Sequence, residues 1–227
     1  MPDARRALLV LRVSSTVVFV LSIVLLTLMP STPVTANVPG FGSAVIGFEL
    51  ATEPAHVLGI LGAADAPERP EQVRRMDLGN RIDYLFMLAY ATLYAGIALL
   101  LAAHGRIGRG MTRLLLVLAV LMFTGDALEN RQLLILSQVT DAAAMTGPLA
   151  ALGCWTHLKW YAIYAASLLV APFIWREQGW WRWTAVPFAL AALLGFTGPV
   201  HPPGIEAGSY VVGIAWLMTL IRAYQRA

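Results

Sequence analysis

Long apolar segments separated by shorter polar ones constrain the fold of this chain most strongly. About 20 apolar residues are enough for a helix to cross the ~30 Å hydrocarbon core of a bilayer. Hydrophobic residues make up 58% of the sequence and charged residues only 13%, against about 25% charged in an average soluble protein. We therefore expect an all-α, polytopic transmembrane helix bundle forming one membrane domain. Its six predicted spans are residues 13–29, 82–103, 113–135, 149–171, 183–200 and 208–222.

Two of these segments have a second interpretation. The fifth is short for a span and carries Pro187 and Gly195. The first follows two arginines and precedes Val34-Thr35-Ala36, a pattern that also fits a cleaved signal peptide. Its apolar run is longer than the usual 7–15 residues of such a peptide, which favours a membrane span.

The placement of arginines predicts the orientation of the spans, because cytoplasmic segments are enriched in Lys and Arg. If the N-terminus is cytoplasmic, the segments on that side hold ten arginines and two acidic residues, whereas the rest of the chain holds six basic and eleven acidic residues. We expect a multi-pass protein of the cell (inner) membrane with both termini in the cytoplasm. Four tryptophans are expected to anchor it at the inner interface: Trp175, Trp180, Trp181 and Trp183.

The longest polar stretch, residues 30–81, is expected on the outer side. Within it, Thr52-Glu53-Pro54 is typical of a helix start, and an apolar face follows at 57–61. We expect a short helix at the outer interface or against the bundle. Residues 64–80 are expected to end as a helical lead-in to the second span.

Charged side chains inside the apolar segments are the strongest pointer to a functional site, since each costs roughly 2.5–3.5 kcal/mol at the centre of a membrane helix. Asp126, Glu129 and Asn130 share one face of the third span. Asp83 opens the second span, and Lys159 lies inside the fourth. The spacing along each span places these groups near the outer leaflet. We expect Lys159 to pair with Asp126 or Glu129, because a carboxylate lowers the cost of burying an ammonium group.

Four short motifs follow one another along the chain: Phe48-Glu49-Leu50-Ala51, Asp83-Tyr84-Leu85-Phe86, Asp126-Ala127-Leu128-Glu129-Asn130 and Leu158-Lys159. This pattern resembles a group of small bacterial integral membrane proteins to which no activity is assigned. The resemblance covers roughly residues 48–171, and the two apolar segments after it look like an addition. It implies that Glu49 belongs to the same site, but it implies no activity.

The candidate residues fall into two groups. Neighbouring carboxylates repel one another, so one of them can hold a proton and act as a general acid. The candidate catalytic residues are Glu49, Asp83, Asp126, Glu129 and Lys159. The candidate substrate-binding residues are Asn130, Tyr90, Tyr94, His157 and Tyr161. We expect no metal and no cofactor, because the four histidines are scattered and Cys154 is the single cysteine.

Three functions remain open from the sequence. The first is a pocket that binds or transforms a lipid-like or isoprenoid-like molecule. The second, a proton-coupled transporter, is weakened by the one-sided polar groups and by the lack of an inverted repeat. The third is a structural or accessory subunit whose polar residues hold helices together. The bilayer is an expected partner, nucleic acid is not, and the oligomeric state stays open.

Overall fold

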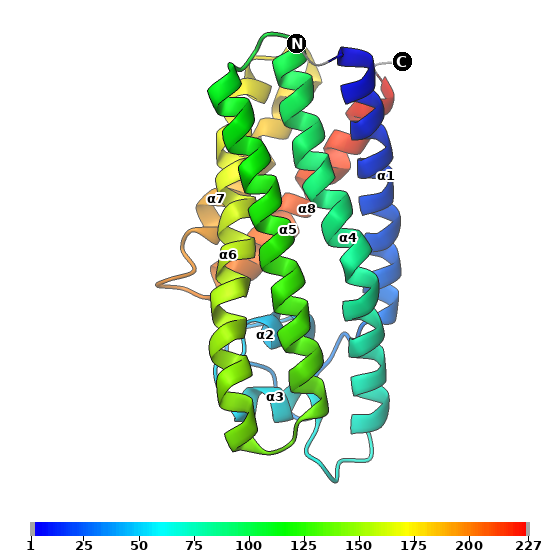
Figure 1. Cartoon of the computed structure of the whole chain (residues 1–227), viewed down its shortest axis with the longest axis vertical. Helices are drawn as coiled ribbons and strands as arrows, with labels where there is room; N and C mark the ends of the chain where they lie inside the picture. Colours follow the sequence, from blue (N-terminus) through cyan, green and yellow to red (C-terminus); the bar gives the residue numbers. More distant parts are fainter. Residues whose placement is uncertain (1–2, 226–227) are drawn as a thin grey trace. The chain divides into compact units, whose positions relative to one another are not determined.

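The computed structural model describes residues 3–225, and within this range it contains helices and no strand, which confirms the predicted all-α class. The elements, shown in Figure 1, are α1 (Ala4–Leu28), α2 (Ala44–Glu49), α3 (Pro54–Leu61), α4 (Arg69–Ala103), α5 (Arg109–Gln138), α6 (Ala142–Trp175), the 3-10 helix η1 (Trp180–Thr184), α7 (Ala185–Gly195) and α8 (Pro203–Gln225). Arg226, one of the arginines counted above, lies outside the described residues.

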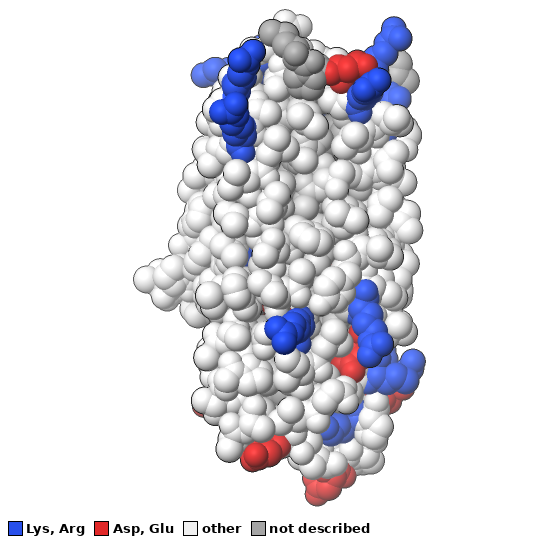
Figure 2. Space-filling model, viewed as in Figure 1, with Lys and Arg blue, Asp and Glu red and all other residues white. Residues whose placement is uncertain are grey.

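Five of these helices, α1, α4, α5, α6 and α8, are long and apolar enough to cross a membrane. Their outward faces carry large aliphatic side chains. Leu26 of α1 is 79% exposed and Val120 of α5 is 62% exposed. Figure 2 shows a broad surface without any charged side chain. Exposed apolar side chains of this kind suit contact with lipid.

The predicted span at 183–200 differs from the structure. Here η1 is followed by α7, which has 11 residues and is therefore only about 16 Å long, too short for the hydrocarbon core. The chain then turns through 196–202, where Thr197 N–H donates to Leu194 O and Val200 N–H donates to Thr197 O. Pro199 and Pro202 lie in this stretch, and proline cannot continue a helical hydrogen-bond pattern.

The described chain divides into two compact units. Unit 1 comprises Met1–Leu21, Phe86–Phe123 and Trp160–Ala227, and unit 2 comprises Ser22–Leu85 and Thr124–Lys159. Each of the long helices α1, α4, α5 and α6 contributes one part to each unit. The candidate catalytic residues all belong to unit 2.

In unit 1, α7 and α8 pack as a hairpin around the ring of Tyr164. A Cβ on Gly195 or Gly208 would overlap this ring, so the two glycines permit the close packing. The last turn of α8 lies beside α1, where Arg12 Nε donates to Ala223 O over 2.8 Å. The N-terminal part of α1 and the C-terminal end of α8 are thus at the same end of this unit.

In unit 2, side chains on the first turns of α4 bind the long segment between α1 and α4. Arg75 donates to the last carbonyl of α1, Leu28 O (2.8 Å), and to Met29 O (3.1 Å), which directly follows it. Gln72 donates to Thr32 O (2.9 Å) and to Ile60 O (3.1 Å). Helix ends leave their last carbonyls without intrahelical partners, so these side chains fasten the segment to α4.

Helix α3 lies where the sequence predicts a short helix. It begins at Pro54 after Glu53, which adopts extended backbone angles, and it ends before Gly62. Gly62 has a φ of +94°, a region that disfavours residues with a Cβ. Val57, Ile60 and Leu61 are fully buried, so α3 packs against the rest of unit 2.

Candidate functional site

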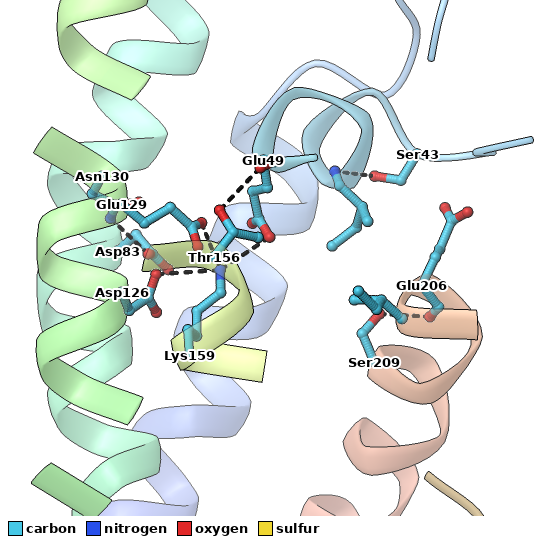
Figure 3. A network of polar contacts seen from close by, with 12 residues as sticks. Ser43, Glu49, Asp83, Asp126, Glu129, Asn130, Thr156, Lys159, Glu206 and Ser209 are labelled. Carbon is cyan, nitrogen blue, oxygen red and sulfur yellow. Dashed lines mark hydrogen bonds and ion pairs between the residues drawn. The ribbon is translucent and has the colours of Figure 1, made fainter. Parts of the chain in front are cut away.

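Four helices supply the charged residues of the candidate site, each from its part in unit 2. Glu49 is the last residue of α2, and Asp83 lies on α4. Helix α5 carries Asp126, Glu129 and Asn130 on one face, and α6 carries Lys159. We call these six residues the Lys159 cluster, and Figure 3 shows them converging. The sequence predicted this convergence.

The ammonium group of Lys159 is the centre of the cluster. Its Nζ donates to Glu129 Oε1 over 2.6 Å and to Glu49 Oε2 over 3.0 Å. It also lies 3.3 Å from Asp126 Oδ1. The expected pairing of Lys159 with Asp126 or Glu129 is therefore present with both acids, and Glu49 joins them.

Burial differs across the cluster. The side chain of Glu129 is 0% exposed, and those of Asp126 and Lys159 are 4% and 5% exposed. The side chain of Glu49 is 12% exposed. Access to the ammonium group is therefore greater on the side where Glu49 lies.

Asn130 connects the cluster to α4. Its Nδ2 donates to Asp83 Oδ2 over 2.7 Å and to Asn80 O over 3.1 Å. Asn130 is 1% exposed. These two hydrogen bonds link Asn130 of α5 to α4 and orient the carboxyl group of Asp83.

Glu49 reaches Lys159 because α2 is held by its neighbours. Thr156 Oγ1, one turn before Lys159 on α6, donates to Glu49 O over 3.0 Å. At the other end of α2, Ser43 Oγ accepts from Ile46 N–H as an N-cap. Asn37 Nδ2 donates to Ser43 O over 3.0 Å. The segment that brings Glu49 to the cluster is therefore held by its own polar side chains and by Thr156 of α6.

The close approach of α5 and α6 depends on Gly125. A Cβ at this position would lie 2.8 Å from Lys159 N and 3.1 Å from Trp155 O, which is too close for a side chain. The glycine next to Asp126 thus lets the backbone of α6 bring Lys159 within reach of the α5 carboxylates.

The contacts join one cation to several anions. Lys159 contacts three carboxylates, and Asp83 follows through Asn130. Among the described residues, Glu129 Oε2 and Asn80 Nδ2 are buried and make no hydrogen bond. Burying an excess of ionised carboxylates is costly, so this arrangement favours uptake of protons or of a donor group.

The candidate substrate-binding residues other than Asn130 have contacts of a different kind. Tyr90, Tyr94 and Tyr161 belong to unit 1, where Tyr90 stacks on Trp216, Tyr94 shares a hydrogen bond with Ser167 and Tyr161 stacks on Phe196. His157 belongs to unit 2, and its Nδ1 lies 2.6 Å from Gly153 O one turn earlier on α6. Their role in binding a ligand stays a prediction. Within residues 3–225, no group of three or more His, Cys, Asp or Glu side chains is placed to hold a metal ion.

Sequence reasoning missed Thr156, Asn80 and Gly125 as members of the site's surroundings. It also missed Arg69, whose guanidinium donates to Ser137 O over 3.0 Å and to Val139 O over 3.2 Å at the end of α5. Arg69 is the first residue of α4 and only 8% exposed, but no local sequence pattern distinguishes it from a solvated arginine.

Comparison with protein-family models, with curated proteins and with solved structures found no match. The fold and the five apolar helices nevertheless define the class: this is a multi-pass α-helical membrane protein.

Proposed function

We propose that this protein binds a lipid-like or isoprenoid-like molecule at the Lys159 cluster and that carboxyl groups of the cluster act as acid or base on its polar head. The observation that carries the proposal is the buried ammonium of Lys159 in contact with Glu49, Asp126 and Glu129. Intramembrane ionisable residues are costly and usually mark functional sites.

The charge of the cluster favours a particular kind of head group. Carboxylates outnumber the ammonium group that they contact, so an amine or hydroxyl head would find acceptors, whereas a phosphate head would be repelled. A buried carboxyl group that holds a proton can donate it to a bound molecule. Glu129, fully buried, fits the role of proton donor, and Glu49, at the more exposed side, fits the role of first contact.

The surface near the cluster suits an apolar tail. Leu85, two residues after Asp83 on α4, is 60% exposed, and Tyr84 is 37% exposed. Tyr84 OH donates to Ala127 O of α5 over 3.2 Å, which links the two helices beside the cluster. A tail lying along these side chains would bury apolar area, which contributes about 25 cal/mol per Å².

The positive-inside rule supports placing the cluster toward the outer leaflet. Asn130 lies about 26 Å along α5 from Arg113, close to the full thickness of the hydrocarbon core. The exposed Arg131 follows it directly. A molecule entering from the outer leaflet would therefore meet the cluster near the interface.

The proposal is tested by analysing the small molecules that co-purify with the protein in mild detergent. Mass spectrometry of solvent extracts compares the native protein with Glu129→Gln and with the control Glu71→Gln, whose carboxylate pairs with Arg74 on the exposed start of α4. We expect one molecule to be enriched in the native protein and in the control, and to be lost in Glu129→Gln at equal yield of folded protein. Identical extracts from all three proteins would contradict the proposal.

A purely structural cluster is the second candidate, because its hydrogen bonds link α2, α4, α5 and α6. In that case Glu129→Gln would lower only the unfolding temperature, and no bound molecule would depend on it. The same extracts, combined with thermal unfolding of the three proteins, separate the two functions.

A further inference from the structure

Unit 1 contains an exposed group of arginines and aromatic rings that the proposed function does not use. The guanidinium carbon of Arg182, on η1, lies 5.2 Å from the ring centroid of Trp183 and 5.7 Å from that of Trp175. The two indole rings meet edge to face at 5.3 Å. Trp175 is 46% exposed and Trp183 is 49% exposed, so the guanidinium of Arg182 lies against both rings at the surface.

A second arginine, in the turn between α6 and η1, also has an aromatic neighbour. Arg176, which directly follows α6, has its guanidinium carbon 5.8 Å from the ring centroid of Phe173. Within residues 3–225, the guanidinium groups of Arg176 and Arg182 make no hydrogen bond and no ion pair. Stacking on an aromatic face leaves the N–H groups at the edge of the guanidinium available for an anion.

The acidic residue of this turn does not neutralise the two arginines. Glu177 lies 3.5 Å from Arg106, and its side chain is only 10% exposed. It lines a small cavity together with His104 and Trp181. The surface of the turn is therefore positively charged, although an acid lies beside Arg176 in the sequence.

We infer that Arg176 and Arg182, supported by Trp175 and Trp183, form a binding site for the phosphate group of an anionic phospholipid. Guanidinium groups bind phosphate oxygens through paired hydrogen bonds, and exposed tryptophans at the end of an apolar helix lie at the level of the head groups. A choline head would bring its own positive charge next to the arginines, so an anionic head is favoured over a zwitterionic one. The site is independent of the Lys159 cluster.

The inference is tested by tryptophan quenching with the full-length protein in detergent micelles. Quenching by brominated phosphatidylglycerol is compared with quenching by brominated phosphatidylcholine. Three proteins are measured: the native protein, the double variant Arg176→Gln with Arg182→Gln, and the control double variant Arg109→Gln with Arg113→Gln. The control arginines are exposed and lie in the first turns of α5. The contact of each site arginine with the lipid is expected to account for about a fivefold preference for the anionic lipid, since an arginine near an anionic surface contributes about 1 kcal/mol.

We expect the preference for phosphatidylglycerol to be lost in the Arg176 and Arg182 variant and kept in the control. Arg182→Lys should keep only part of it, because an ammonium group lacks the planar fork of donors. An equal loss in the control would show a diffuse effect of surface charge and overturn the inference. So would the absence of any preference in the native protein, or displacement of the lipid by millimolar inorganic phosphate.

Discussion

Lys159 is the residue on which the charged cluster depends. Its ammonium group lies within 3.3 Å of three carboxylates, two of which are almost completely buried. Removing one partner of a buried ion pair is far more damaging than removing a surface pair, because the remaining charge has neither water nor a counter-ion. The packing of the cluster therefore depends strongly on a single side chain.

Replacing Lys159 with methionine tests this dependence. We expect Lys159→Met to lower the free energy of unfolding by about 3–5 kcal/mol, the usual cost of leaving buried charges without a partner. Unfolding in detergent, followed by circular dichroism, measures the change. The control is Arg131→Met on the exposed surface next to Asn130. A loss below about 1 kcal/mol for Lys159→Met would mean that the carboxylates do not need the ammonium group.

Gly125 provides a second test at the residue scale. We expect Gly125→Ala to lower the free energy of unfolding by about 1–3 kcal/mol, because the new Cβ would overlap the backbone of α6 at Lys159. Gly153→Ala on α6 is the control, since nothing lies within 4 Å of a Cβ there and alanine favours a helix by about 1 kcal/mol. Equal effects at the two positions would argue against the close approach of α5 and α6.

At the scale of elements, the first turns of α4 hold the ends of other helices. Arg75 binds the end of α1, and Arg69 binds the end of α5 and also donates to Gly62 O, just after α3. Both arginines lie in the segment that the sequence predicts on the outer side of the membrane. Their hydrogen bonds to helix ends show that they have a structural role there. They keep residues 30–62, and with them Glu49, in place beside α6.

Neighbouring arginines on α4 allow a matched comparison. We expect Arg75→Gln to lower the free energy of unfolding by about 1.5–3 kcal/mol, because charged donors to the end of α1 are lost. Arg74→Gln should change it by less than about 1 kcal/mol, since its ion pair with Glu71 is exposed. Hydrogen exchange should show faster exchange in residues 30–62 only for Arg75→Gln. Equal protection in both variants would be evidence against the fastening role.

Helices with a strong local pattern were predictable from the sequence. The four-residue apolar face after Pro54 predicts α3, and the long apolar runs predict α1, α4, α5, α6 and α8. Helix α2 was missed, since its six residues are too few to show a period and lie among prolines and glycines. The fifth span was wrong because apolar composition alone does not reveal that the chain turns back after Gly195.

Part of the candidate site was also predictable from the sequence, because it too has a strong local pattern. Charges inside apolar segments identify Asp126, Glu129 and Lys159 without any structure, since their cost in lipid requires partners. Glu49 came only from the resemblance, because it lies outside the predicted spans and far from the other residues in sequence. Thr156 and Gly125 act through packing between helices, which single-sequence patterns do not describe.

At the scale of the whole molecule, the orientation in the membrane decides which leaflet the cluster lies in. In unit 1, the end of α8 lies beside α1, where Thr16 and Tyr224 share a hydrogen bond of 3.0 Å. We expect this end to face the cytoplasm, on the basis of its arginines.

Labelling of single cysteines tests the orientation. In a Cys154→Ser background, we expect a membrane-impermeant maleimide to label Asp65→Cys in intact cells, because residue 65 is exposed in the predicted outer segment. Gly108→Cys, exposed between α4 and α5, should be labelled only after the membrane is permeabilised. The reverse pattern would place the cluster near the cytoplasmic leaflet.

The central claim is that Lys159 and its carboxylates form a chamber for a bound molecule. An experimental density map of the protein in lipid, at a resolution that defines side chains, tests this most directly. We predict non-protein density beside Glu49, within hydrogen-bonding distance of a cluster carboxylate, with its apolar part against Leu85. A map in which Lys159 and Asp126 point apart, each meeting acyl chains or water alone, would contradict the account.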